Sequence, residues 1–148
     1  MGSDENRRKR TIKKDECTGN IIIYDEYGSK IQTIKPDCCS GDYFIYDKYD
    51  IKIGRIKKDC CTGNDIICDK NDNRVQTIKH NWCTGDKIVC DKNDNEIRRI
   101  KYNCCTGDDV IYDIDGSEIG RIKHDFWTGY EILYEEMGDK KEFKGLYD

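Results

Sequence analysis

The chain of 148 residues is long enough for one domain with its own core, and 38% of its residues are charged, with a formal net charge of −4. Acidic and basic residues are interleaved, which argues against a nucleic-acid partner, and no apolar stretch approaches the roughly 18 residues that cross a bilayer, so no membrane partner is expected. No signal peptide opens the chain, which favours a cytoplasmic location, or an extracellular one if the native N-terminus differs.

The chain begins with a polar and basic segment, residues 1–10, which we expect to be an N-terminal extension or cap. A 22-residue unit then recurs without insertion through residues 11–125, the predicted repeat array, and residues 126–148 form a divergent last unit that is predicted to cap it. Each unit carries a cysteine followed by Thr or Ser and then Gly, and the last unit has tryptophan in place of this cysteine. The column is Cys17, Cys39, Cys61, Cys83, Cys105 and Trp127.

Each unit is predicted to form a strand, a turn, a second strand and a second turn, since short runs of Ile, Val, Tyr and Cys are typical of β-strands. In chain order the predicted strands are 22–25, 30–35, 44–47, 52–57, 66–69, 74–79, 88–91, 96–101, 110–113, 118–123 and 132–135. The turn between the two strands holds residue types that tolerate a left-handed backbone. Its positions are Gly28, Asp50, Asp72, Asp94, Gly116 and Gly138.

This repeat predicts an all-β fold, for which two architectures fit. We favour a β-solenoid with capped ends, because every coil must keep the perimeter of its neighbours and the repeat has no insertion. The alternative is an antiparallel array of β-hairpins or a closed barrel. Charge favours this alternative, since a solenoid would stack the acids from Asp25 to Glu135, and the lysines from Lys13 to Lys123, at a single strand spacing.

The cysteine column shares its position with Trp127, so we interpret it as a structural ladder of inward-facing core residues that Trp127 and Phe126 close at the last unit. Stacked coils would also bring Cys68 within bridging distance of Cys90, which is the disulfide alternative. Adjacent cysteines, as at Cys38-Cys39, lack the C-x-x-C spacing of structural zinc sites, which disfavours a metal at these doublets.

Several oxygen-rich turns are candidates for calcium, because they resemble the opening of D-x-[DN]-x-[DN]-G loops. None of them carries the distal bidentate glutamate of such loops, and Asp, Asn and Gly are also the residues that any tight turn prefers. No other cofactor is predicted. The candidate calcium ligands are Asp69, Asp72, Asp91, Asp94, Asp113 and Asp115.

For catalysis the sequence offers no nucleophile elbow, phosphate loop or histidine metal site, and His80 and His124 are expected to be exposed turn residues. We therefore predict a non-enzymatic structural or interaction protein, a repetitive β-scaffold whose regular surface is its functional part. Self-association or a polyvalent surface ligand is the expected mode of interaction.

The alternative is a repeat-built module that binds calcium or carbohydrate, and a fibril subunit and an ice-binding surface are further hypotheses. Carbohydrate would stack on exposed tyrosines. The tyrosines considered are Tyr27, Tyr43, Tyr49, Tyr102 and Tyr130.

Overall fold

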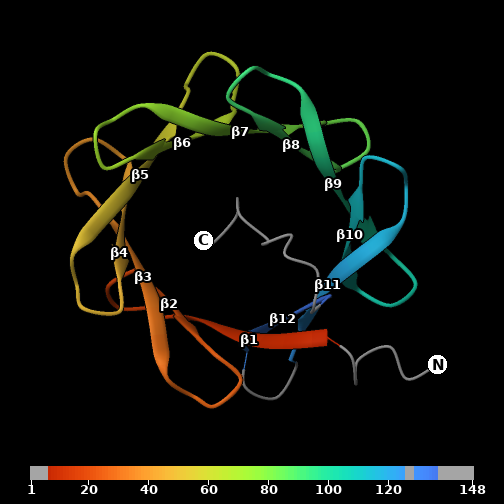
Figure 1. Cartoon of the computed structure of the whole chain (residues 1–148), viewed down its shortest axis with the longest axis horizontal. Helices are drawn as coiled ribbons and strands as arrows, with labels where there is room; N and C mark the ends of the chain where they lie inside the picture. The colour runs from red at the N-terminus through yellow and green to blue at the C-terminus, as the bar shows by residue number, and fades with distance from the viewer. Residues whose placement is uncertain (1–6, 126–128, 137–148) are drawn as a thin grey trace.

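The computed structural model describes residues 7–125 and 129–136, which form twelve antiparallel strands closed into one barrel (Figure 1). Each strand pairs with its neighbours along the chain, and the first strand pairs with the twelfth. The strands are β1 (Arg7–Lys14), β2 (Ile21–Tyr24), β3 (Lys30–Pro36), β4 (Tyr43–Asp47), β5 (Lys52–Lys58), β6 (Asp65–Asp69), β7 (Arg74–His80), β8 (Lys87–Asp91), β9 (Glu96–Asn103), β10 (Asp108–Asp113), β11 (Glu118–His124) and β12 (Glu131–Glu136).

The barrel confirms the all-β prediction and its closed-barrel alternative, whereas the favoured β-solenoid is wrong. In a solenoid the equivalent strands of successive units would pair with each other in parallel. Here neighbouring strands are antiparallel, so that equivalent strands such as β4 and β6 are separated by β5. The columns of acids and of lysines are therefore not stacked at one strand spacing, and the repulsion that such stacking would create is avoided.

The strands nearest the two ends of the described chain close the barrel. Arg7 pairs with Glu136 and Ile12 pairs with Glu131, so β1 and β12 form a full antiparallel ladder. β1 thus begins inside residues 1–10, the predicted polar and basic N-terminal segment or cap, and residues 7–10 belong to the sheet. Trp127, Phe126 and Gly138 lie outside the described residues.

The core is a ring of aliphatic side chains, one from each strand, whose members are spaced by 11 residues. Direct cross-strand partners, such as Ile12 with Ile23 and Ile34 with Ile45, lie at one level of the barrel. All are buried except the partly buried Ile56, so this ring fills the middle of the barrel. Its members are Ile12, Ile23, Ile34, Ile45, Ile56, Ile67, Ile78, Val89, Ile100, Ile111, Ile122 and Leu133.

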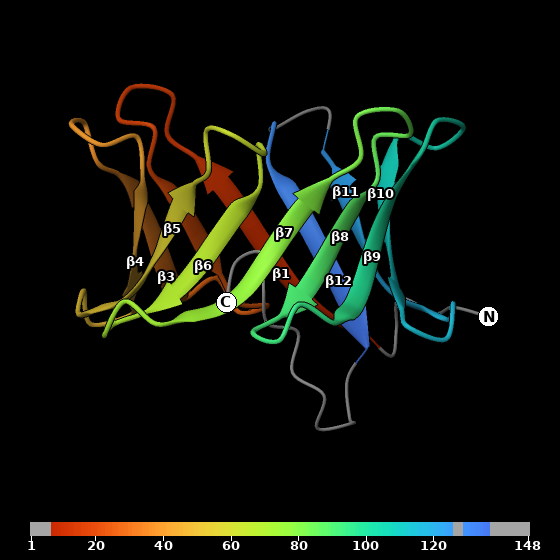
Figure 2. The ribbon, with the colours of Figure 1, turned by 90° about the horizontal axis from the view of Figure 1, so that it is seen from above.

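Two kinds of hairpin loop alternate between the two ends of the barrel (Figure 2). The loops that hold the cysteine column lie together at one end, which we name the CTG rim, and the Asp-x-x-Gly or Asp-x-x-Asp turns lie at the other. In these turns Asp50, Asp72 and Asp94 have φ values of 63°, 70° and 71°, which confirms the predicted left-handed positions. The described part of the chain has no helix with the length and hydropathy of a membrane span.

Candidate functional site

The inner face of the barrel at the CTG rim is where the 22-residue units differ most from one another. Successive side chains of a strand point to opposite faces of the sheet. On each strand, the residue two positions from the core-ring residue, toward the CTG rim, therefore faces the inside of the barrel as the core ring does. These residues meet in cross-strand pairs around the rim, and we name them the mouth ring. The pairs are Lys14 with Ile21, Pro36 with Tyr43, Lys58 with Asp65, His80 with Lys87, Tyr102 with Asp109, and His124 with Glu131.

One sector of the mouth ring lines a cavity of ≈ 180 Å³. Three members of the core ring contribute to its lining, Ile34, Ile56 and Ile78. The mouth ring supplies Ile21, Tyr43, Lys58, Asp65 and Lys87. The cavity therefore combines apolar side chains with two ammonium groups and one carboxylate.

Asp65 is the centre of the charged contacts at this cavity. One carboxylate oxygen lies 2.8 Å from Lys58 Nζ, and the other lies 3.3 Å from His80 Nε2. The imidazole of His80 also stacks on Trp82, with ring centroids 5.8 Å apart. In contrast, the ammonium of Lys87 makes no hydrogen bond or ion pair with the part of the chain that the structure describes. Lys87 is therefore the cation of the cavity that is available to a ligand.

The histidines correct an expectation drawn from the sequence. His80 and His124 are not turn residues, because they end β7 and β11 and belong to the mouth ring. The side chain of His80 is only 23% exposed. His124 lies 3.7 Å from Asp109 and 3.4 Å from Glu131, so both histidines have acidic neighbours in the mouth ring. The variation in these columns, which seemed typical of turns, instead reflects the lining of the mouth.

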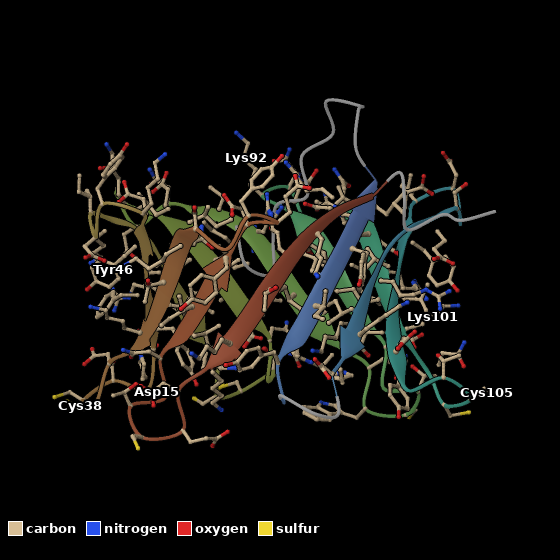
Figure 3. All side chains as sticks on the ribbon, turned by 90° about the horizontal axis from the view of Figure 1, so that it is seen from below. Asp15, Cys38, Tyr46, Lys92, Lys101 and Cys105 are labelled. Atoms are coloured by element: carbon tan, nitrogen blue, oxygen red, sulfur yellow. The ribbon has the colours of Figure 1, made fainter. Side chains whose placement is uncertain are left out.

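The cysteine column does not form the inward ladder that the sequence suggested. Cys17, Cys39, Cys61, Cys83 and Cys105 are all exposed, and they lie in the loops of the CTG rim. In the first loop Gly19 N–H donates to the carbonyl oxygen of Asp15 at 2.7 Å, and Cys17 N–H donates to Asp15 Oδ1 at 2.9 Å. The loop thus satisfies its own polar groups at its tip and leaves the cysteine side chain in solvent. Figure 3 shows Asp15, Cys38 and Cys105 at this same rim, opposite Lys92.

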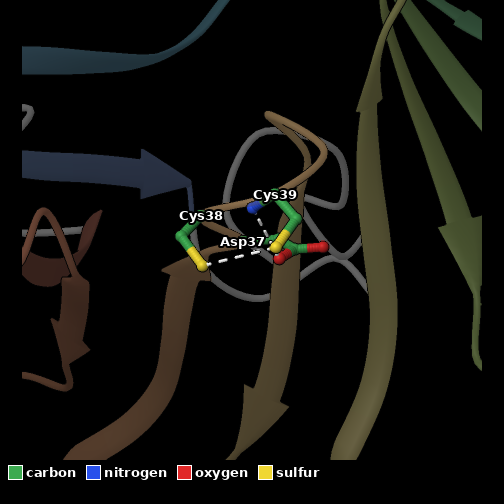
Figure 4. A group of neighbouring side chains, drawn as sticks. All are labelled: Asp37, Cys38 and Cys39. Carbon is green, nitrogen blue, oxygen red and sulfur yellow. Dashed lines mark hydrogen bonds between the residues drawn. The ribbon is translucent and has the colours of Figure 1, made fainter.

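Two of these loops gather three possible metal ligands each. Asp37, Cys38 and Cys39 have ligand atoms that all lie within 4.8 Å of one another, and so do Asp59, Cys60 and Cys61. Figure 4 shows the first group, in which the two Sγ atoms are 3.7 Å apart. Sequence reasoning set these doublets aside because they lack C-x-x-C spacing. The aspartate immediately before each of these two doublets was the signal in the sequence that could have indicated a third ligand.

Both aspartates of these groups are held in the ionised form by local hydrogen bonds. The backbone N–H of Cys39 and then the hydroxyl of Ser40 lower the pKa of Asp37. The pKa of Asp59 is lowered in the same way, first by the N–H of Cys61 and then by Thr62. A carboxylate that accepts hydrogen bonds is favoured over the neutral acid.

Cys68 and Cys90 are the buried cysteines of the chain, and they do not meet. They lie on β6 and β8, with β7 between them, and both are free thiols. Burial raises the pKa of each thiol. The disulfide alternative fails because it required stacked coils, which would have placed these residues on adjacent strands.

The candidate calcium ligands lie at the rim opposite the cysteines, where they serve the turns. Asp69 Oδ1 accepts hydrogen bonds from the N–H groups of Asn71 and Asn73, and Asp91 and Asp113 act in the same way. Asp72 Oδ2 lies 3.1 Å from Lys57 Nζ, and Asp94 Oδ1 lies 3.3 Å from Lys79 Nζ. Asp115 donates its own N–H to Asp113. Calcium binding by this set stays a prediction.

The tyrosines considered for carbohydrate binding are divided between the two ends of the barrel. Tyr27 and Tyr49 are 84% and 72% exposed in turns of the end opposite the CTG rim, whereas Tyr43 and Tyr102 belong to the mouth ring. They therefore do not form one stacking surface.

The chain matches no protein-family model and no curated protein. Among solved structures it is similar to a protein of Arabidopsis thaliana determined by X-ray crystallography, with a TM-score of 0.65 and 13% sequence identity. The similarity covers 88% of this chain and 80% of the plant protein. Because the identity is so low, this likeness supports the fold alone.

Proposed function

We propose that this chain is a non-enzymatic binding protein, in which the barrel is a scaffold and the cavity at the CTG rim binds a small organic anion with an apolar part. The observation that carries the proposal is that one cavity combines isoleucine side chains with the ammonium of Lys87, which has no hydrogen-bond or ion-pair partner among the described residues. An apolar pocket with a few polar groups that fix orientation is the usual design of a small-molecule site.

The volume of the cavity indicates the size of a ligand that would fill it. At ≈ 180 Å³ it is slightly larger than a cavity of about 150 Å³ that accommodates benzene in an engineered protein. An aromatic or branched aliphatic carboxylate of about this size would fill it. Its apolar part would contact Ile34, Ile56 and Ile78, and its carboxylate would pair with Lys87.

The chemistry of the lining supports binding rather than catalysis. Its polar side chains are those of Tyr43, Lys58, Asp65 and Lys87, and none of the lining residues is a serine, threonine or cysteine. A hydroxyl or thiol nucleophile of the serine, threonine or cysteine type is thus missing from the lining.

Titration calorimetry of the full chain with benzoate and with isovalerate tests the proposal, with benzamide as the neutral analogue. The carboxylates should bind and benzamide should bind more weakly, because a charge-assisted hydrogen bond to Lys87 is lost. Lys87→Met should weaken carboxylate binding by about 10-fold or more. Lys92→Met, at the opposite end of the barrel (Figure 3), is the matched control and should bind normally. Equal affinity of the Lys87→Met and wild-type proteins, or no binding of either carboxylate, would refute this function.

A further inference from the structure

The two Asp-Cys-Cys groups of the CTG rim have the geometry of a metal chelate. A tetrahedral zinc ion with Zn–S bonds of about 2.3 Å holds its two sulfur ligands about 3.8 Å apart. The Sγ atoms of Cys38 and Cys39 are 3.7 Å apart, far longer than a disulfide bond of about 2.05 Å. The two thiols of this first group are thus not bridged, and their sulfur atoms are spaced like two ligands of one tetrahedral ion. The ligand atoms of the second group lie within the same 4.8 Å limit as those of the first.

We propose that the loops β3–β4 and β5–β6 each bind one thiophilic divalent cation, Zn²⁺ or Cd²⁺, through two cysteine thiolates and one aspartate. The ligands are Asp37, Cys38 and Cys39 in the first loop, and Asp59, Cys60 and Cys61 in the second. Solvent completes the tetrahedron, since all four cysteines are exposed. Each binding event releases the two thiol protons, because the thiolate is the ligand form.

The aspartate can bind a cation without giving up its role in the loop. Asp37 Oδ1 accepts the N–H of Cys39 at 3.1 Å, and Oδ2 accepts the hydroxyl of Ser40 at 2.8 Å. An ionised carboxylate has about four acceptor sites, so a lone pair remains on each oxygen. The same hydrogen bonds fix the carboxylate beside the two thiols, which reduces the ordering that metal binding requires.

The other loops of the rim provide internal comparisons. In the loops of Cys17 and Cys83 the preceding residue is Glu16 or Trp82, so each loop has one thiol. The loop of Cys104 and Cys105 has two thiols but begins with Asn103, whose Oδ1 accepts the N–H of Cys105 at 2.9 Å. Asparagine therefore supports the loop in the same way as aspartate but lacks the charged ligand. Two strong sites per chain are expected.

The test is a titration of the full, reduced chain with Cd²⁺, followed through the ultraviolet charge-transfer band of thiolate bound to cadmium. Zn²⁺ affinity is measured in parallel by competition with a chromogenic chelator, and released protons by a pH indicator. The wild-type chain should bind two equivalents tightly and release two protons for each. The double variant Cys38→Ser, Cys60→Ser should lose both sites, whereas Cys17→Ser should keep both.

Replacing aspartate by asparagine removes the charged metal ligand but keeps the hydrogen bonds of the loop, so it separates the loss of a ligand from the loss of loop structure. Asp37→Asn with Asp59→Asn should keep the loops folded, as Asn103 does, and should weaken both sites by about 10-fold or more. Conversely, Asn103→Asp should create a third strong site. Fewer than two tight equivalents, tight binding that survives the double serine variant, or an Asn103→Asp chain that still binds only two ions tightly would each overturn the proposal.

Discussion

At the scale of single residues, one device recurs in both kinds of loop. An Asp or Asn opens the loop, and its Oδ1 accepts the N–H of the residue two positions later, as Asp25 does from Tyr27 and Asn81 from Cys83. Such Asx turns replace hydrogen bonds that the strands can no longer make. Many of the acids are therefore structural, which explains why they repeat so regularly.

Low pH should destabilise the barrel, because it protonates the aspartates of these Asx turns. The N–H groups of Asn73 and Asn71 lower the pKa of Asp69, and those of Asn95 and Asn93 lower the pKa of Asp91. Because the folded pKa lies below the ordinary value of 3.8, each carboxylate adds stability above that pH, and the contribution is lost as the pH falls through 3.8 and toward the folded pKa.

Asp69→Asn with Asp91→Asn tests this pH dependence, because the amide oxygen still accepts both N–H groups but does not titrate. The wild-type chain should have the higher thermal midpoint at pH 7, and the two midpoints should converge below about pH 3. Asp115→Asn, whose carboxylate accepts no hydrogen bond from the described residues, is the control and should follow the wild-type curve. A constant difference between the double variant and wild type at all pH values would contradict the assignment.

At the scale of strands, lysines and aromatic rings alternate on the outer face. Lys35 Nζ lies 4.9 Å from the ring centroid of Tyr46, and Lys101 Nζ lies 5.8 Å from that of Tyr112. Figure 3 shows Tyr46 and Lys101 on the outside of the barrel. Antiparallel hairpins thus separate the lysines of the column from one another. Four of them make cation–π contacts, Lys13, Lys35, Lys101 and Lys123, whereas Lys57 and Lys79 pair with Asp72 and Asp94.

Two glycines mark places where neighbouring strands approach closely. A Cβ at Gly54 would lie 2.7 Å from the carbonyl oxygen of Cys68, and one at Gly120 would lie 2.7 Å from that of Tyr134. Gly54→Ala should therefore lower the free energy of unfolding by about 1–3 kcal/mol, as overpacking does. Urea denaturation measures this change. Gln32→Ala, at the equivalent position of β3, adds no atoms and should cost less; an equal loss in both variants would show that the close approach is not the cause.

The sequence predicted the strands and left-handed turns well because these depend on local patterns. One error, besides the choice of a solenoid, lay in the direction of the cysteine side chains. Trp127 in that column suggested a buried position, whereas the loop geometry around Asp15 places Cys17 in solvent. The decisive pattern was the isoleucine column, which repeats every 11 residues and not only every 22. One core residue per 11 residues means one strand and one turn per half-unit, which favours an up-and-down sheet over coils.

The mouth ring was harder to recognise from sequence. Its members stand in columns that vary between units, such as Tyr43, Asp65 and Lys87, and variation in a repeat usually marks exposed loops. Only closure of the sheet brings these columns together around one opening. The cavity is therefore a property of the closed barrel and of no single unit.

At the scale of the whole molecule, closure depends on β1 and β12. Arg8 lies 2.8 Å and Arg10 3.5 Å from Glu135 Oε1, and Glu135 is buried. This ion-pair group adds to the backbone ladder between the two strands. A closed sheet has no unpaired edge, so identical chains have no strand to extend. The absence of insertions, which was first attributed to stacked coils, also suits a ring whose strands must match in length and register.

Removing β1 should convert this closed sheet into an open one. Deletion of residues 1–14 would leave β2 and β12 without partners, and we expect the truncated chain to associate in a concentration-dependent manner through these edges. Light scattering coupled to size-exclusion chromatography measures the association. The matched control carries residues 1–14 after residue 148. Because Arg7 pairs with Glu136, β1 can follow β12 as the second strand of a hairpin, and this permuted chain should recover the mass distribution of the wild type. A truncated chain with the same mass distribution and unfolding midpoint as the wild type would show that β1 is not what closes the barrel.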